Sequence, residues 1–218
     1  MKKTLLLAGV AGALFSLNAN AMDLTPYVGA RVLYTSIDAK MKYSDATDSE
    51  KYNIDDKGIG AGLFVGSAIK LPYGAIRAEL EYNKKADTKK SYTTNIGLPE
   101  TFNAKLETQS FMLNAYYDID TGSKITPYIG GGIGYAKLKL NDQYWQDVYA
   151  KNIKDTNFAW QIGAGVAYAV TDNISIDAGY RYIDFGDLSD SGDDGYGGES
   201  EKIDVSANEF YLGVRYNF

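Results

Sequence analysis

The chain has 218 residues, a formal net charge of −6, no cysteine and no histidine. The length fits one domain, and because the charge is acidic we expect no nucleic-acid partner. The lack of cysteine excludes a disulfide framework, and the lack of histidine removes the commonest catalytic acid–base group. After the N-terminal segment, no window approaches the roughly 18 consecutive apolar residues that indicate a transmembrane helix.

Residues 1–21 have the pattern of a secretory signal peptide. Lys2 and Lys3 precede an apolar run of roughly 14 residues, and the small residues Ala19 and Ala21 end it. The run is shorter than the about 20 residues that a membrane-spanning helix needs. We therefore expect cleavage after Ala21 and a domain over residues 22–218, whose net charge becomes −8 once Lys2 and Lys3 are lost. Such a chain can lie in a membrane only as a closed barrel.

Alternation of apolar and polar residues predicts eight β-strands. In chain order they span residues 26–37, 58–69, 75–82, 105–117, 126–139, 158–170, 174–185 and 205–218. The links after the second, fourth and sixth strands are short, whereas the other links are polar and have roughly 16 to 22 residues. Short turns at one end and long loops at the other predict an all-β fold, an eight-stranded antiparallel up-and-down transmembrane β-barrel.

In the segment AIRAELEYN, residues 75–83, local propensity disagrees with periodicity. Its residues are good helix formers, and the spacing of Arg77 and Glu81 suits a helical ion pair. Its apolar residues line one face only at the two-residue period of a strand. We predict a strand with Arg77, Glu79 and Glu81 facing inward and with the lipid-facing residues Ile76, Ala78, Leu80 and Tyr82.

The phase of each strand assigns one face to lipid and the other to the barrel interior, the lumen. All four arginines fall on the inner face, whereas the lysines lie mostly in the signal, the loops, the turns and the strand ends. Because the arginine fork suits enclosed pairing with carboxylates, we expect a charge-paired, largely plugged lumen. Its predicted polar network consists of Arg31, Arg77, Glu79, Glu81, Asn114, Gln161, Asp177, Arg181, Glu209 and Arg215.

The third and fourth long loops contain candidates for contact with a partner. The third loop offers the aromatic residues Tyr144, Trp145 and Tyr149, which are plausible anchors unless they pack against other loops or lipid headgroups. The fourth loop is strongly acidic and offers Asp190, Asp193 and Asp194.

The acidic fourth loop also resembles a calcium loop at four positions, namely Asp190, Asp194, Gly195 and Glu201. Gly192 provides no side-chain ligand at the third position, and strands rather than helices flank the loop. We therefore expect a solvated acidic loop and no metal site.

Nothing in the sequence points to catalysis or to a cofactor. The glycine runs GIGAG and GGGIG lie inside predicted strands, whereas a dinucleotide loop needs a strand before it and a helix after it. Without histidine, and with no spacing that suggests another catalytic group, we expect no enzyme activity and no cofactor.

Several segments resemble the small outer-membrane β-barrel family that includes opacity-type surface proteins and the membrane domain of outer-membrane protein A. The resemblance is carried by TPYVGA, IRAELEY, NAYYD, TPYIGGGIGYA, FAWQIGAGVAY, DNISIDAGYRY and YLGVRYNF. It implies a location in the Gram-negative outer membrane, among its lipid and lipopolysaccharide. It also implies insertion by the barrel-assembly machinery, with Tyr216 and Phe218 as the assembly signal.

The resemblance further implies a surface protein whose four long extracellular loops serve adhesion, surface interaction or envelope integrity. We expect a monomer that contacts a host or cell-surface ligand. One alternative is a small porin that passes ions or small solutes through a narrow polar lumen. A soluble periplasmic barrel of lipocalin type is a second alternative, but it needs an apolar interior, and the charges here fall on the inner face.

Overall fold

The computed structural model describes residues 24–44, 49–85, 88–94, 100–144, 149–190 and 200–218, with side chains described over 24–38, 57–85, 107–139, 155–187 and 204–218. The predicted signal peptide lies outside the described residues. No helix among the described residues is long and apolar enough to cross a bilayer.

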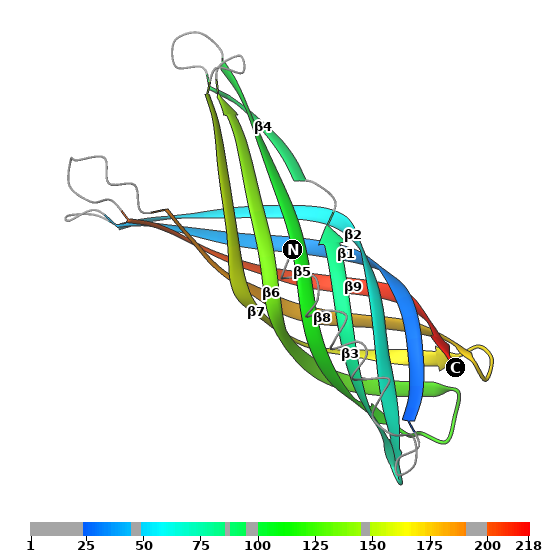
Figure 1. Ribbon diagram of the computed structural model, residues 1–218. Helices are drawn as coiled ribbons and strands as arrows, with labels where there is room; N and C mark the ends of the chain where they lie inside the picture. The colour runs from blue at the N-terminus through cyan, green and yellow to red at the C-terminus, as the bar shows by residue number, and fades with distance from the viewer. Residues whose placement is uncertain (1–23, 45–48, 86–87, 95–99, 145–148, 191–199) are drawn as a thin grey trace, which may run out of the picture.

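The described chain is a closed antiparallel barrel (Figure 1). Its strands are β1 (Leu24–Ser44), β2 (Ser49–Leu71), β3 (Gly74–Lys85), β4 (Thr88–Thr94), β5 (Glu100–Ile119), β6 (Ile125–Tyr144), β7 (Tyr149–Ala169), β8 (Ile174–Asp190) and β9 (Ser200–Asn217). Sequential strands pair with each other except β3 and β4, β1 pairs with β9, and β3 pairs with β5. Because β3 and β4 pair with successive parts of β5, they share one place in the wall. The predicted eight-stranded antiparallel barrel is therefore confirmed.

The strand predicted for residues 75–83 is also confirmed, because β3 covers it and pairs with β2 and β5. Its side chains alternate strictly: Arg77, Glu79 and Glu81 are buried, whereas Ile76 is 46% exposed. Hydrogen bonding to two neighbouring strands outweighs the helix propensity of these residues.

Most strands are longer at the long-loop end than the sequence predicts. The first strand was expected to end at residue 37, but β1 continues to Ser44, which lies opposite Ser49 of β2. The expected long loops are therefore partly hairpin extensions. Alternation of apolar residues identifies only the part of a strand that faces lipid. The backbone hydrogen bonds between strands do not depend on side-chain type, so they continue through polar residues.

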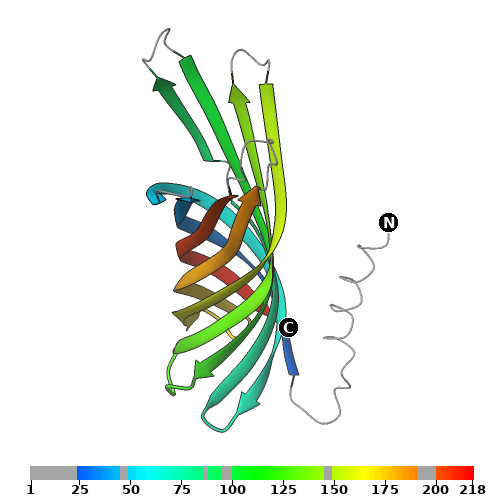
Figure 2. The same cartoon turned by 90° about the vertical axis from the view of Figure 1, so that its left-hand side faces the viewer.

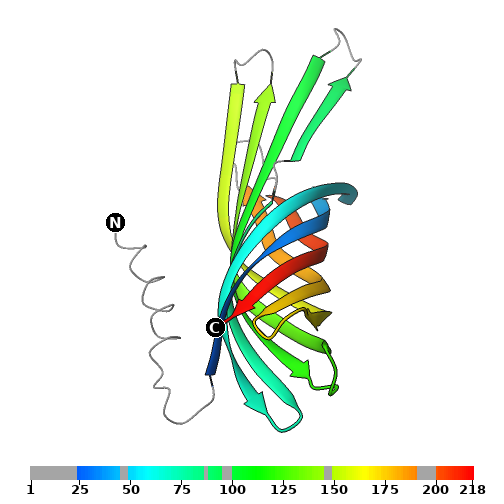
Figure 3. The same cartoon turned by 90° about the vertical axis from the view of Figure 1, so that its right-hand side faces the viewer.

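The wall divides into two groups of strands at the long-loop end (Figures 2 and 3). Pairing between β7 and β8 stops at Trp160 and Asp184, and pairing between β2 and β3 stops at Gly60 and Lys85. Beyond these points β8, β9, β1 and β2 stay hydrogen-bonded as one group, and β4, β5, β6 and β7 as the other.

A bulge in β8 lies at the point where this strand leaves β7. The register with β9 shifts between Asp184 and Asp187, and Gly186 between them has a φ of 76°. The Gly186 N–H donates to Asp184 Oδ1 over 2.8 Å. A side chain at a left-handed φ is disfavoured, so glycine suits this turn of the strand.

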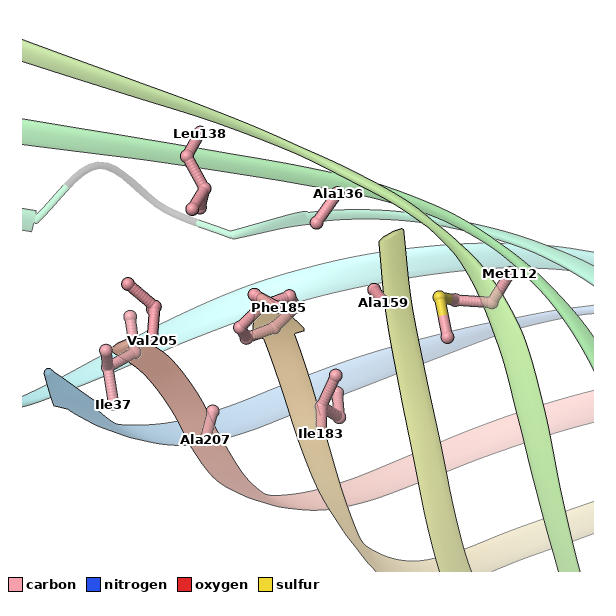
Figure 4. Packing of buried hydrophobic residues seen from close by; sticks show 9 residues of the cluster. All are labelled: Ile37, Met112, Ala136, Leu138, Ala159, Ile183, Phe185, Val205 and Ala207. Carbon is pink, nitrogen blue, oxygen red and sulfur yellow. The ribbon is translucent and has the colours of Figure 1, made fainter. Parts of the chain in front are cut away.

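The hydrophobic core of the barrel lies inside it, toward the long-loop end. Figure 4 shows this apolar layer, which six strands contribute to. Its residues are Ile37, Met112, Ala136, Leu138, Ala159, Ile183, Phe185, Val205 and Ala207.

Candidate functional site

The lumen holds the polar side chains that the sequence singles out. Each predicted network residue lies on the inner face of its strand and is at most 6% exposed. They come from six strands and are Arg31 of β1, Arg77, Glu79 and Glu81 of β3, Asn114 of β5, Gln161 of β7, Asp177 and Arg181 of β8, and Glu209 and Arg215 of β9.

The central layer of the lumen is an ion-pair network built around Glu81. Arg31 Nη1 lies 3.0 Å from Glu81 Oε1, and Arg31 Nη2 lies 2.8 Å from Glu79 Oε1. Arg181 Nη1 lies 2.8 Å from Glu81 Oε2, and Arg181 also pairs with Glu209 through Nε, 2.6 Å from Oε1. Asn114 Nδ2 donates to Glu81 Oε2 over 2.9 Å. These contacts join opposite walls of the barrel.

A second layer at the short-turn end combines arginine with tyrosine. The Arg77 guanidinium lies 2.8 Å from Asp118 and sits 4.7 and 4.8 Å from the ring centres of Tyr116 and Tyr128. The hydroxyls of Tyr128 and Tyr211 are 3.0 Å apart. Cation–π contacts of this kind strengthen when water is excluded.

The short-turn layer is less completely paired than the central one. Arg215 Nη2 lies 3.7 Å from Asp177 Oδ1, and neither carboxylate oxygen of Asp177 accepts a hydrogen bond from the described protein atoms. Arg215 Nε and Nη1 and Arg77 Nη2 likewise have no hydrogen-bond partner there. Polar groups at this end thus have capacity left for further hydrogen bonds.

Two charged lumen residues were missed by the sequence reasoning. Lys85 is 5% exposed, with its Nζ 3.4 Å from Glu209 Oε2 and 4.3 Å from the ring centre of Phe185. Asp118 is 8% exposed and pairs with Arg77. Lys85 is an even number of residues from Glu79 and Glu81, so it faces the same side of the strand. Extending the predicted strand beyond residue 82 would therefore have identified Lys85 as a lumen residue.

Charge in the lumen is balanced once these two residues are included. Among the described residues, the buried cations are Arg31, Arg77, Lys85, Arg181 and Arg215, and the buried anions are Glu79, Glu81, Asp118, Asp177 and Glu209. Leaving one of these groups without its partner would cost several kcal/mol, so a balanced set is expected in an enclosed space.

The other candidates lie mostly beyond the described side chains. This applies to the contact residues Tyr144, Trp145, Tyr149, Asp190, Asp193 and Asp194 and to the calcium-like positions. Tyr216 and Phe218 are exposed, and their rings meet edge to face with centroids 5.2 Å apart. Within the described ranges, no group of three or more acidic residues is placed to hold a metal ion.

Comparison with known proteins agrees with this architecture. Residues 5–218 match the family model described as "Outer membrane protein beta-barrel domain". The outer membrane protein PagN of Salmonella typhimurium is 34% identical over 177 residues, which cover 74% of each chain. The opacity protein opA67 of Neisseria gonorrhoeae is 24% identical, over 88% of this chain and 97% of its own. The crystal structure of Neisserial surface protein A matches with a TM-score of 0.57 at 22% identity, over 88% of this chain and 97% of that one.

Proposed function

Because the chain belongs to the outer membrane protein β-barrel family, we propose that it is a non-enzymatic surface protein with a plugged lumen that acts through its long-loop end. The Gram-negative outer membrane is its location. In such barrels the short turns face the periplasm and the long loops face outward. A rigid scaffold that displays variable loops is a common arrangement for binding.

One observation carries the proposal, namely the ion-pair network that crosses the lumen. Arg31 and Arg181 both bind Glu81 from different strands, at 3.0 and 2.8 Å. A solute moving along the barrel axis would have to separate these buried pairs, which costs several kcal/mol. The layer beyond them is largely apolar, with Lys85, Thr108 and Ser110 as buried polar neighbours, so it offers few groups to replace a solute's water shell. Transport is therefore disfavoured, and the long-loop end is the part that remains available for function.

The proposed contact residues are Tyr144, Trp145 and Tyr149 of the third loop and Asp190, Asp193 and Asp194 of the fourth. The proposed ligand is a molecule of a host or neighbouring cell surface. Relatives such as PagN and the opacity proteins support a surface role. We further propose a monomer that is inserted by the barrel-assembly machinery, with Tyr216 and Phe218 as its assembly signal.

Replacing loop segments tests this proposal. Bacteria that display the intact protein should adhere to cultured epithelial cells more than bacteria without it. Replacing residues 145–148 or 191–199 with a short Gly-Ser turn should reduce adhesion, whereas replacing residues 121–123 at the short-turn end should not. Surface display of each variant is measured by antibody binding. Unchanged adhesion in both long-loop variants would contradict the proposal.

A narrow pore is the second candidate, and it is favoured by the atoms of Asp177 and Arg215 that have no hydrogen-bond partner among the described protein atoms. If the lumen is plugged, the purified barrel in a planar bilayer should show no steady single-channel steps. Steps that disappear in Asp177→Asn or Arg215→Gln would replace our proposal with a pore.

A further inference from the structure

The outward face of the barrel carries an aromatic row at its long-loop end. Tyr82 lies opposite Phe111, Phe111 opposite Tyr135, and Tyr135 opposite Phe158. Phe111, Tyr135 and Phe158 are 46, 63 and 56% exposed, and the rings of Tyr82 and Phe111 are 4.7 Å apart. Exposed aromatic side chains in a band are typical of the membrane interface. This row therefore marks the level at which the hydrocarbon region ends and lipid headgroups begin.

A basic row lies directly above the aromatic one. Two residues further along the same strands, at the next outward-facing position, Lys84 lies opposite Gln109, and Gln109 lies opposite Lys137. Both lysines are exposed. Neighbouring strands are about 4.8 Å apart, so the two lysine backbones are separated by about 10 Å. Their flexible side chains are long enough to converge above Gln109, whose amide group adds two further donors.

A third lysine near this row is already paired. Lys139 lies two residues beyond Lys137 on β6, and its Nζ is 3.7 Å from Glu107 Oε2. Among the described side chains, no carboxylate forms an ion pair with Lys84 or Lys137, the two lysines that flank Gln109. The positive charge of the row is therefore concentrated on these two lysines.

The opposite side of the barrel differs at the same level. There the aromatic row of Tyr180, Phe210 and Tyr34 lies below Tyr182, Asn208, Ser36 and Lys57. The outward-facing residues two positions further toward the long loops are acidic or neutral. Asp184 of β8 and Asp38 of β1 both lie opposite Ser206 of β9. Asn208 Nδ2 donates to Asp38 Oδ2 over 3.2 Å. A pair of lysines flanking a donor at headgroup level is thus, among the described residues, a feature of the β3, β5 and β6 side.

We propose that Lys84, Gln109 and Lys137 bind the phosphate group of a phosphorylated glycolipid of the outer leaflet. The lipid's acyl chains would then lie against Tyr82, Phe111 and Tyr135 of the row below. Headgroup phosphates lie at the level where these lysines are exposed, and lysine ammonium groups bind phosphate as compact point charges. This inference rests on the membrane location alone and not on the proposed adhesive function.

The test compares lipids and variants with the purified, refolded barrel in detergent micelles. Binding of bisphosphorylated lipid A is measured by native mass spectrometry, beside the dephosphorylated lipid and inorganic phosphate. The double variant Lys84→Gln, Lys137→Gln removes the proposed site. The control Lys70→Gln, Lys124→Gln removes two exposed lysines at the short-turn end. Heat-modifiable gel mobility shows that each variant is folded.

We expect the Lys84→Gln, Lys137→Gln variant to bind lipid A roughly 25-fold more weakly, from about 1 kcal/mol for each lysine near a charged lipid surface. The control should bind within about twofold of the wild type, and Lys84→Arg, Lys137→Arg should retain binding because it keeps the charge. The inference is overturned if dephosphorylated lipid binds as well as lipid A. It is also overturned if the two glutamine variants bind alike, or if inorganic phosphate alone competes fully at equal concentration.

Discussion

At the residue scale, Glu81 holds the central network together, because its carboxylate accepts from Arg31, Arg181 and Asn114. Glu81→Gln keeps the shape of the side chain but removes the negative charge that two buried arginines share. Breaking a buried pair from one side costs about 3–5 kcal/mol. We therefore expect the free energy of unfolding, measured in urea with lipid vesicles, to fall by about 3 kcal/mol.

The matched control is Glu107→Gln on the outer surface. Glu107 lies 3.7 Å from Lys139, and its side chain is 21% exposed. Pairs in such positions contribute about 0–1 kcal/mol, so this variant should change the free energy of unfolding by less than about 1 kcal/mol. Equal effects of the two substitutions would mean that the lumen is hydrated enough to screen Glu81.

The inner-face positions of the ten network residues could be predicted from strand phase, but their partners could not. Arg77 was expected to pair with one of the four acidic residues assigned to the lumen, whereas it binds Asp118. Asp118 follows the predicted fourth strand and was read as part of a turn. Which carboxylate an arginine reaches depends on the stagger between strands, and alternation along one strand does not contain that information.

At the element scale, two neighbouring glycines of β6 test whether successive residues of this strand face alternately into the lumen and out to the lipid. A Cβ on Gly132 would point inward and collide with Asn114, whereas a Cβ on Gly131 would point outward and meet only Gln161 O at 3.0 Å. Gly132→Ala should lower the free energy of unfolding by about 1–3 kcal/mol, the usual cost of overpacking. Gly131→Ala should change it by less than about 0.5 kcal/mol.

Urea unfolding of both variants in lipid vesicles checks this prediction. Each substitution adds one methyl group to the same strand, so strand propensity is matched between them. A larger loss in Gly131→Ala than in Gly132→Ala would contradict the inward assignment of β6.

The apolar pattern predicted the existence and order of the strands, but not where their pairing stops. The sequence around Trp160 and Phe158 continues to alternate without a break, yet β7 and β8 separate at Trp160 and Asp184. Only the glycine at position 186 hints at the bulge, and an isolated glycine in a strand has several explanations. Separation of the wall depends on pairing between distant strands, so it becomes visible only in the folded chain.

At the scale of the whole molecule, the lumen contains two different barriers in series. The central network resists a solute through paired charges, whereas the layer around Leu138 and Phe185 is buried and largely apolar, with Lys85 and Thr108 beside it. A hydrophobic constriction blocks ions because water leaves it. Loss of one barrier leaves the other intact, so neither layer alone decides whether the barrel conducts.

This arrangement predicts a combined requirement for conduction. The paired variant Glu81→Gln, Arg181→Gln removes one charge of each sign, and Leu138→Ser, Phe185→Ser makes the apolar layer polar. In planar bilayers neither double variant alone should produce single-channel current steps, because the unchanged layer still excludes ions. All four substitutions together should produce steady single-channel steps in barrels whose gel mobility shows that they are folded. Steps from Glu81→Gln, Arg181→Gln alone would show that the apolar layer admits water, and the network would then be the sole barrier.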